Sequence, residues 1–124
     1  MAGIAGVPGS VAEAVYPPVC PLTGADTARH GTLAAEAWRG LALLSGPACR
    51  ACGRELPGAP EGEALLCDGC TARPRPWTRG VAAFRYDGTG RELVLALKRG
   101  DRLDLAPLIA GFMQAAGGAL VARA

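Results

Sequence analysis

Four of the five cysteines lie between residues 49 and 70, in the stretch "CRACGRELPGAPEGEALLCDGC". They form two CxxC pairs, Cys49/Cys52 and Cys67/Cys70, separated by fourteen residues. A CxxC loop presents two sulfurs on one tight turn, and two facing loops can hold a metal ion between four thiolates, with Zn–S distances of about 2.3 Å. We therefore predict one structural Zn²⁺ bound by these four cysteines, with no coordination position left for a catalytic water.

Other uses of four cysteines are less consistent with the sequence. Disulfides belong to oxidising compartments, and the N-terminus has no secretion signal. A redox CxxC does not need a second pair, whereas an iron site would use the same four ligands and stays open. Pro57, Gly58, Pro60 and Gly62 in the spacer favour an irregular excursion between the pairs. Cys20 has no partner, and we predict a free or buried thiol.

The stretch that precedes these cysteines resembles them in spacing, which predicts an internal repeat. The equivalent positions are Cys20 and Cys49, Thr23 and Cys52, Gly24 and Gly53, Leu33 and Leu66, Ala34 and Cys67, and Ala37 and Cys70. Three of the four ligand positions of the first copy are therefore Thr or Ala, and His30 is the only spare nitrogen. We predict a metal-free first copy, held instead by Leu33, Trp38 and Leu41.

These motifs divide the chain into five segments. We expect residues 1–18 to form an N-terminal arm, with a short helix at 10–16 or a frayed terminus, residues 19–45 the degenerate first copy, and residues 46–72 the intact second copy. Residues 73–79, "RPRPWTR", read as a linker, because each proline pushes its predecessor toward extended geometry. Residues 80–124 contain the remaining regular elements.

In that last segment, residues 80–86 are predicted to form a strand and "DGTG" at 87–90 a turn. Residues 91–99, "RELVLALKR", fit a helix or a strand, and their strong helix formers favour the helix, with Gly100 after its end. A second helix is indicated by the spacing of Leu105, Leu108, Ile109, Phe112, Met113 and Ala116. Asp101 or Asp104 is expected to cap it, and Gly117-Gly118 to separate it from another apolar stretch.

Charge and hydropathy restrict the class of protein. Residues 1–70 carry four basic and seven acidic residues, a net charge of −3, and residues 71–124 carry nine and four, a net charge of +5. We find no apolar run that approaches the roughly 20 residues of a membrane span. We therefore expect a cytoplasmic protein without a membrane partner. The basic half offers a phosphate-facing patch to nucleic acid, with Trp77 and Phe84 for stacking. Its members are Arg73, Arg75, Arg79, Arg85, Arg91, Lys98, Arg99 and Arg102.

The motifs resemble a known family when they are read in order. "VYPPVCPLTG", "LAAEAWRGL", "SGPACRACGRELPG", "LCDGCTARPRPW" and "AAFRYDGTGRELVLALKRGDRLDLAPLIAGFM" closely resemble the N-terminal half of the ComF family, over roughly residues 11–122. That resemblance implies a double zinc ribbon followed by an amidophosphoribosyltransferase-like domain, and a link to bacterial competence and DNA uptake. The expected fold class is small α+β, with zinc ribbons followed by the first strand and helices of a truncated phosphoribosyltransferase-type α/β domain.

Two departures from the family pattern bear on function. The first ribbon lacks three of its cysteines, as described above. The family pattern also continues with a "VPVP"-type strand and a "DD…TTG" loop that grips phosphoribosyl pyrophosphate, and residues 1–124 contain neither. We therefore expect no catalytic or cofactor-binding residues in this chain, and an incomplete domain over residues 80–124.

Three functions agree with the sequence to different degrees. The favoured one is the zinc-binding portion of a ComF-like phosphoribosyltransferase, non-catalytic alone, with a separately encoded catalytic core or a second copy of itself as partner. The alternative is a free-standing zinc-ribbon module that binds nucleic acid or a protein. An independent enzyme is disfavoured, because His30 is the only histidine and no nucleophile–base pair is evident.

Overall fold

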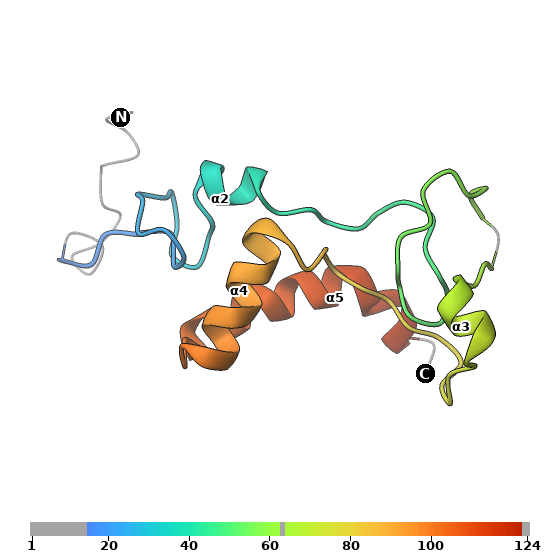
Figure 1. Cartoon of the computed structure of the whole chain (residues 1–124). Helices are drawn as coiled ribbons and strands as arrows, with labels where there is room; N and C mark the ends of the chain where they lie inside the picture. The colour runs from blue at the N-terminus through green and yellow to red at the C-terminus, as the bar shows by residue number, and fades with distance from the viewer. Residues whose placement is uncertain (1–14, 63, 123–124) are drawn as a thin grey trace. The chain divides into compact units, whose positions relative to one another are not determined.

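The computed structural model describes residues 15–62 and 64–122 (Figure 1). Its helices are α2 (Ala35–Arg39), α3 (Asp68–Ala72), α4 (Gly88–Arg99), the 3₁₀ turn η2 (Leu103–Leu105) and α5 (Ala106–Ala122). The described residues contain no strand longer than an isolated antiparallel bridge, of which there are three. The helix predicted at 10–16 falls almost entirely outside the described residues.

The chain divides into two compact units. The first comprises Met1–Ala42 and Tyr86–Ala110, and the second comprises Leu43–Arg85 and Gly111–Ala124. Each unit holds one copy of the predicted repeat, so the sequence repeat corresponds to a division of the fold.

In the first unit, α4 begins earlier than the sequence predicts. The prediction of a turn at residues 87–90 is wrong, because Gly88–Gly90 form the first turn of α4. The Thr89 amide donates to the Gly40 carbonyl at 3.1 Å, and its buried hydroxyl donates to the Ala37 carbonyl at 2.6 Å. The Gly40 carbonyl, just beyond the end of α2, thus gains a partner. The Ala37 carbonyl, which also accepts from the Gly40 amide at 3.1 Å, gains a second donor. The predicted helix at 91–99 is confirmed, and Gly100 follows its last residue.

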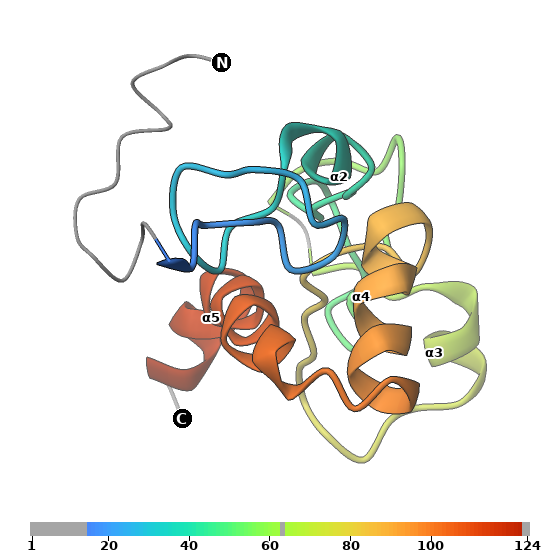
Figure 2. The same cartoon turned by 90° about the vertical axis from the view of Figure 1, so that its left-hand side faces the viewer.

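Beyond α4 the chain turns and passes through η2 into α5, as Figure 2 shows. Leu93 of α4 and Leu105 of η2 are completely buried, and these two elements pack together. The predicted aspartate cap is wrong: Asp101 has a positive φ of 52°, and the Asp104 carboxylate accepts two hydrogen bonds from Arg102. That pairing lowers the pKa of Asp104.

The α5 helix continues through Gly117-Gly118 instead of ending there. Together with η2 it forms a segment of 20 residues, Leu103–Ala122, in which an 18-residue window has mean hydropathy 1.6 and is 11% buried. By length and composition this segment is sufficient to cross a membrane, so the expectation that no apolar run approaches that length is wrong. Apolar core helices of soluble proteins meet the same criterion, and length alone therefore does not place it in a bilayer.

In the second unit, residues 80–86 do not form the predicted strand. The Gly80 amide donates to the Arg50 carbonyl at 2.8 Å, and farther along only Phe84 forms a bridge, with Leu43. Residues 80–86 thus bond to Arg50 at one end and to Leu43 at the other, and no described segment runs beside them for long enough to form a β-ladder. The Phe84 ring packs edge-on against Phe112, with centroids 5.9 Å apart.

Candidate metal centre

The first cysteine pair lies on a tight hairpin-like loop. The Gly53 amide donates to the Cys49 carbonyl at 2.8 Å, and the Cys49 amide donates to the Arg54 carbonyl at 2.7 Å. Gly53 has φ +79°, and a Cβ at this position would lie 2.6 Å from the Ala82 amide nitrogen. Only glycine satisfies both conditions, because other residues rarely adopt this backbone conformation and would clash here.

The second pair lies at the start of a short helix. Cys67 is the N-cap of α3 with extended backbone angles, and Cys70 lies within its first turn. The Thr71 hydroxyl donates to the Cys67 carbonyl at 3.0 Å. The Arg50 amide donates to the Leu65 carbonyl at 2.9 Å, which ties the end of the spacer to the first loop. The two pairs are therefore brought together by backbone contacts.

The four sulfurs form a compact cluster. All of them lie within 4.8 Å of one another, and Sγ of Cys52 is 3.7 Å from Sγ of Cys67. A tetrahedron with Zn–S bonds of about 2.3 Å has sulfur–sulfur edges of about 3.8 Å. A disulfide would instead require about 2.05 Å, and all five cysteines are free thiols. The predicted four residues thus come together at a spacing that fits a tetrahedral metal ion.

The electrostatics of the cluster favour partial ionisation before metal binds. Burial raises the pKa of Cys49, but hydrogen bonds from backbone amides and from Cys52 outweigh burial and lower that pKa to about 6. The pKa of Cys67 is also lowered, mainly by a hydrogen bond from the backbone of Cys70. The Arg54 amide lowers the pKa of Cys52, whereas burial and the three neighbouring sulfurs outweigh that amide and raise it to about 11.

These shifts predict how zinc affinity depends on pH. At neutral pH Cys49, with its pKa of about 6, is largely ionised, and Cys52, with its pKa of about 11, holds a proton that zinc must displace. Affinity should therefore rise with pH, by at least about tenfold per unit between pH 7 and 9. Competition titrations with a zinc chelator at several pH values measure this slope, and a pH-independent affinity would contradict it.

The first copy of the repeat has the same backbone geometry. The Cys20 amide donates to Ala25 at 2.6 Å and the Gly24 amide to Cys20 at 2.8 Å, as their equivalents do around Cys49. Gly24 has φ +78°, against +79° for Gly53. Ala34 is the N-cap of α2, as Cys67 is of α3, and both helices have five residues. The predicted equivalences are thus reproduced in three dimensions.

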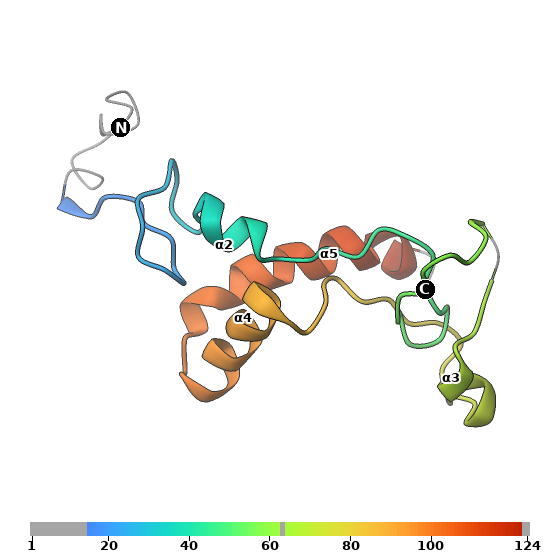
Figure 3. The ribbon, with the colours of Figure 1, turned by 45° about the horizontal axis from the view of Figure 1, so that its top comes forward.

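The interior of this copy differs from the prediction. Cys20, Ala34 and Ala37, which occupy ligand positions, form its buried cluster, with Leu22 and Leu33 packed against them. Figure 3 shows the backbone of this copy in blue to cyan, with the loop that leads into α2. Trp38, predicted to hold this copy together, is 48% exposed. A thiol and two methyl groups have therefore taken the place of the metal, and the bulky side chain is not the centre of the core.

Cys20 keeps one feature of a ligand. The Thr23 amide points at its sulfur at 3.5 Å. Burial raises the pKa of Cys20, but hydrogen bonds from Thr23, Ala34 and Leu22 lower it to about 7. In the described part of the chain, the four cysteines at 49–70 are the only cluster of three or more metal-ligating side chains, so His30 and Cys20 do not form a second one.

Residues 75–80 contact the metal cluster, which the sequence did not reveal. Arg75 Nε donates to Sγ of Cys70 at 3.5 Å, which is the main cause that raises the pKa of Arg75. The Trp77 indole N–H donates to the Ala51 carbonyl at 2.6 Å. From the sequence, both side chains were assigned to a nucleic-acid patch. Their position within a few residues of Cys70 could have indicated a contact with the cluster.

Comparison with known families agrees with this geometry. Residues 11–71 match the double zinc ribbon domain, a range that includes both copies of the repeat and all four clustered cysteines. No curated protein and no solved structure matches the chain. Residues 11–71 are therefore a zinc-binding double zinc ribbon domain, in which the four clustered cysteines lie in the second copy.

Proposed function

We propose that the second ribbon holds one structural zinc through Cys49, Cys52, Cys67 and Cys70. The observation that carries this proposal is the cluster of four sulfurs within 4.8 Å of one another. Four protein thiolates complete a tetrahedral shell, so the ion offers no open position to a substrate. When bound, the ion supplies folding energy to a segment whose own core is mostly cysteine and alanine.

Metal analysis of the purified chain tests this proposal. We expect one zinc per chain by inductively coupled plasma mass spectrometry, after expression in zinc-supplemented medium and removal of loose metal. Two zinc ions per chain would refute the metal-free first copy, and iron in place of zinc would refute the identity of the ion.

The finer proposal is that this ribbon belongs to the N-terminal portion of a ComF-like phosphoribosyltransferase. Its support is the order of motifs along residues 11–122, from the two ribbons to "RYDGTGRELVLALKRGDR". In the family, catalysis is implied for a "DD…TTG" loop that residues 1–124 do not contain. Purified chain given phosphoribosyl pyrophosphate should therefore release no pyrophosphate, and turnover by the chain alone would overturn the proposal.

The partner in this proposal is a separately encoded catalytic core or a second copy of the chain, within the cytoplasm. Exposed apolar side chains on α5, such as Met113 and Val121, support an association surface. Reduced thiols, which the metal site requires, are typical of the cytoplasm. Light scattering would show self-association as a mass above 12.6 kDa. Recovery of the chain in the membrane fraction would instead favour α5 as a bilayer segment.

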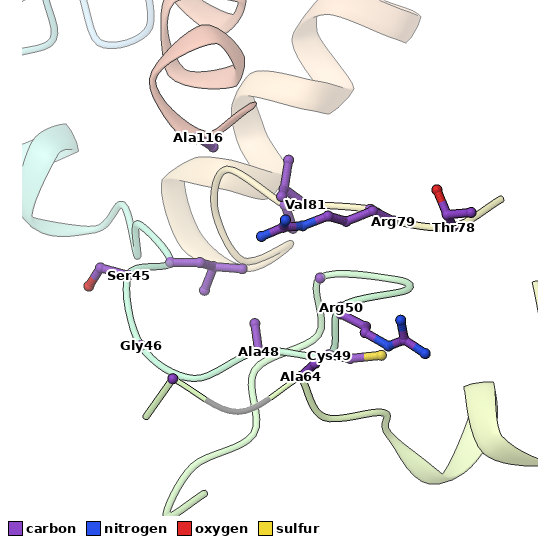
Figure 4. A pocket seen from close by; sticks show the side chains of 15 residues that line it. Ser45, Gly46, Ala48, Cys49, Arg50, Ala64, Thr78, Arg79, Val81 and Ala116 are labelled. Carbon is purple, nitrogen blue, oxygen red and sulfur yellow. The ribbon is translucent and has the colours of Figure 1, made fainter. Parts of the chain in front are cut away.

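One observation favours nucleic-acid binding as a second candidate. A cavity of about 540 Å³ in the second unit has Arg50 and Arg79 among its lining residues, and the described residues that line it include no acidic one (Figure 4). Figure 4 shows Arg79 on the side of Thr78 and Val81, and Arg50 on the opposite side with Cys49. Phosphate groups suit such a pair of guanidinium groups, and the 51% exposed Trp77 offers a stacking surface.

Binding to a fluorescent oligothymidylate tests the second candidate. If it holds, affinity at low salt should fall steeply as salt rises, and Arg50→Gln with Arg79→Gln should weaken it at least tenfold. Arg39→Gln is the matched control, because Arg39 is an exposed arginine of α2 outside both this cavity and the basic patch. Absence of binding at low salt, or equal losses in the control, would remove this candidate.

A further inference from the structure

The segment that follows α3 contacts both halves of the metal cluster. Arg75 reaches Cys70 of the second pair, at 3.5 Å from its sulfur. Trp77 reaches the loop between Cys49 and Cys52, through the 2.6 Å bond to the Ala51 carbonyl. Gly80 reaches the same loop, through the 2.8 Å bond to the Arg50 carbonyl. Residues 75–80, which we name the strap, thus add a second connection between the two halves of the cluster, beside the bond from the Arg50 amide to the Leu65 carbonyl.

The two side chains of the strap also support each other. The Arg75 guanidinium lies 5.9 Å from the Trp77 ring centroid, within the range of a cation–π contact. The indole is fixed in turn by its bond to Ala51. A planar guanidinium that is held over a fixed ring points its N–H groups in a defined direction, which a flexible ammonium group does not. The hydrogen bond to Cys70 therefore has a pre-oriented donor.

Charge gives this donor a specific role. Four thiolates and one Zn²⁺ carry a net charge of roughly −2, and a hydrogen-bonded cation partly offsets that charge. Groups that hydrogen-bond to metal ligands orient them, and their loss costs about 10- to 100-fold in metal affinity. Glycine at position 80 is part of the same arrangement, because a Cβ there would collide with the Ala51 carbonyl oxygen.

We propose that Arg75 and Trp77 are positioning residues of the zinc centre: they hold Cys70 and the Cys49–Cys52 loop in place and slow the loss of zinc. The proposal rests on zinc binding by the second ribbon. It assigns to "RPRPW" a role in metal retention, in addition to that of a connection between segments. Arg75 acts through the Cys70 sulfur and does not itself contact the ion.

Zinc transfer to a competing chromogenic chelator, 4-(2-pyridylazo)resorcinol, measures this role on the full chain. We expect Arg75→Gln to speed zinc transfer and weaken zinc affinity by about tenfold or more. Trp77→Phe, which keeps an aromatic ring but loses the indole N–H, should give a smaller effect in the same direction. Arg73→Gln is the matched control, since Arg73 is exposed, lies two residues away and makes no side-chain hydrogen bond among the described residues.

Cobalt substitution gives a second readout that does not depend on overall stability. Thiolate–Co²⁺ absorption bands report the geometry around the ion, and Arg75→Gln should shift them while Arg73→Gln should not. Arg75→Lys keeps the charge without the planar donor, so we expect it to restore only part of the retention. Equal transfer rates and spectra for Arg75→Gln, Trp77→Phe and Arg73→Gln would overturn the proposal. Absence of zinc from the unmodified chain would instead refute zinc binding itself.

Discussion

Replacing Cys49 with serine should remove zinc from the protein and unfold residues 47–72. Cys49 is 1% exposed and its sulfur belongs to the cluster of four, so its loss leaves three thiolates and an incomplete shell. Structural zinc contributes about 10–16 kcal/mol of apparent binding free energy in small zinc domains. That contribution is as large as the roughly 5–15 kcal/mol by which whole domains are typically stable. The segment therefore has no other interaction large enough to replace the metal.

The chain supplies a matched control at Cys20. This residue occupies the equivalent position of the first copy, is also 1% exposed, and lies in a loop with the same hydrogen bonds. Cys20→Ser should keep one zinc per chain and cost only the few kcal/mol typical of a buried point substitution. Native mass spectrometry counts the zinc, and amide hydrogen exchange over residues 47–72 follows the unfolding.

The two variants separate a metal ligand from a buried thiol. Retention of zinc by Cys49→Ser would contradict the four-cysteine site. Loss of zinc from Cys20→Ser would show that the first copy takes part in binding, against its assignment as metal-free. A chelator added to the unmodified chain should reproduce the exchange pattern of Cys49→Ser, because both remove the same ion.

Local chemistry was sufficient to predict the cluster and the repeat. A CxxC loop fixes its own geometry within a few residues, and the equivalence of Cys20 with Cys49 could be read from spacing. The helix at 91–99 was likewise predictable, because its residues are strong helix formers and Gly100 follows them. Each of these features depends on residues that are close together in the chain.

The predictions that were wrong, and the features that were missed, depend on contacts between residues far apart in the sequence. The start of α4 is fixed by the Thr89 hydroxyl bonding to Ala37, fifty-two residues earlier. Gly80 is held by its bond to the Arg50 carbonyl and by its close approach to Ala51, and residues 80–86 do not form the predicted strand. The bond from Trp77 to Ala51 joins residues that are twenty-six positions apart. It places a predicted linker segment beside the cluster of four cysteines. Propensity and spacing contain no information on such contacts.

Restoring three cysteines to the first copy should create a second zinc site. The substitutions are Thr23→Cys, Ala34→Cys and Ala37→Cys, which together with Cys20 reproduce the ligand set of the second copy. The first copy already has the required backbone: its glycine has φ +78°, and its N-cap residue has φ −65° and ψ 156°, against −74° and 163° at Cys67. What it lacks is sulfur, and we expect two zinc ions per chain.

Magnitudes support a net gain from this change. Ala34 and Ala37 are buried, so the added sulfurs cost about 1–3 kcal/mol of overpacking when no metal is present. A structural zinc returns about 10–16 kcal/mol at neutral pH, which is several times larger. The variant should therefore be less stable than the unmodified chain in a chelator and more stable in excess zinc, as thermal unfolding would show. Thr23→Cys alone supplies only two thiolates and should keep a single zinc. If the triple variant also binds only one, the first copy has lost the ligand-presenting geometry as well as its ligands.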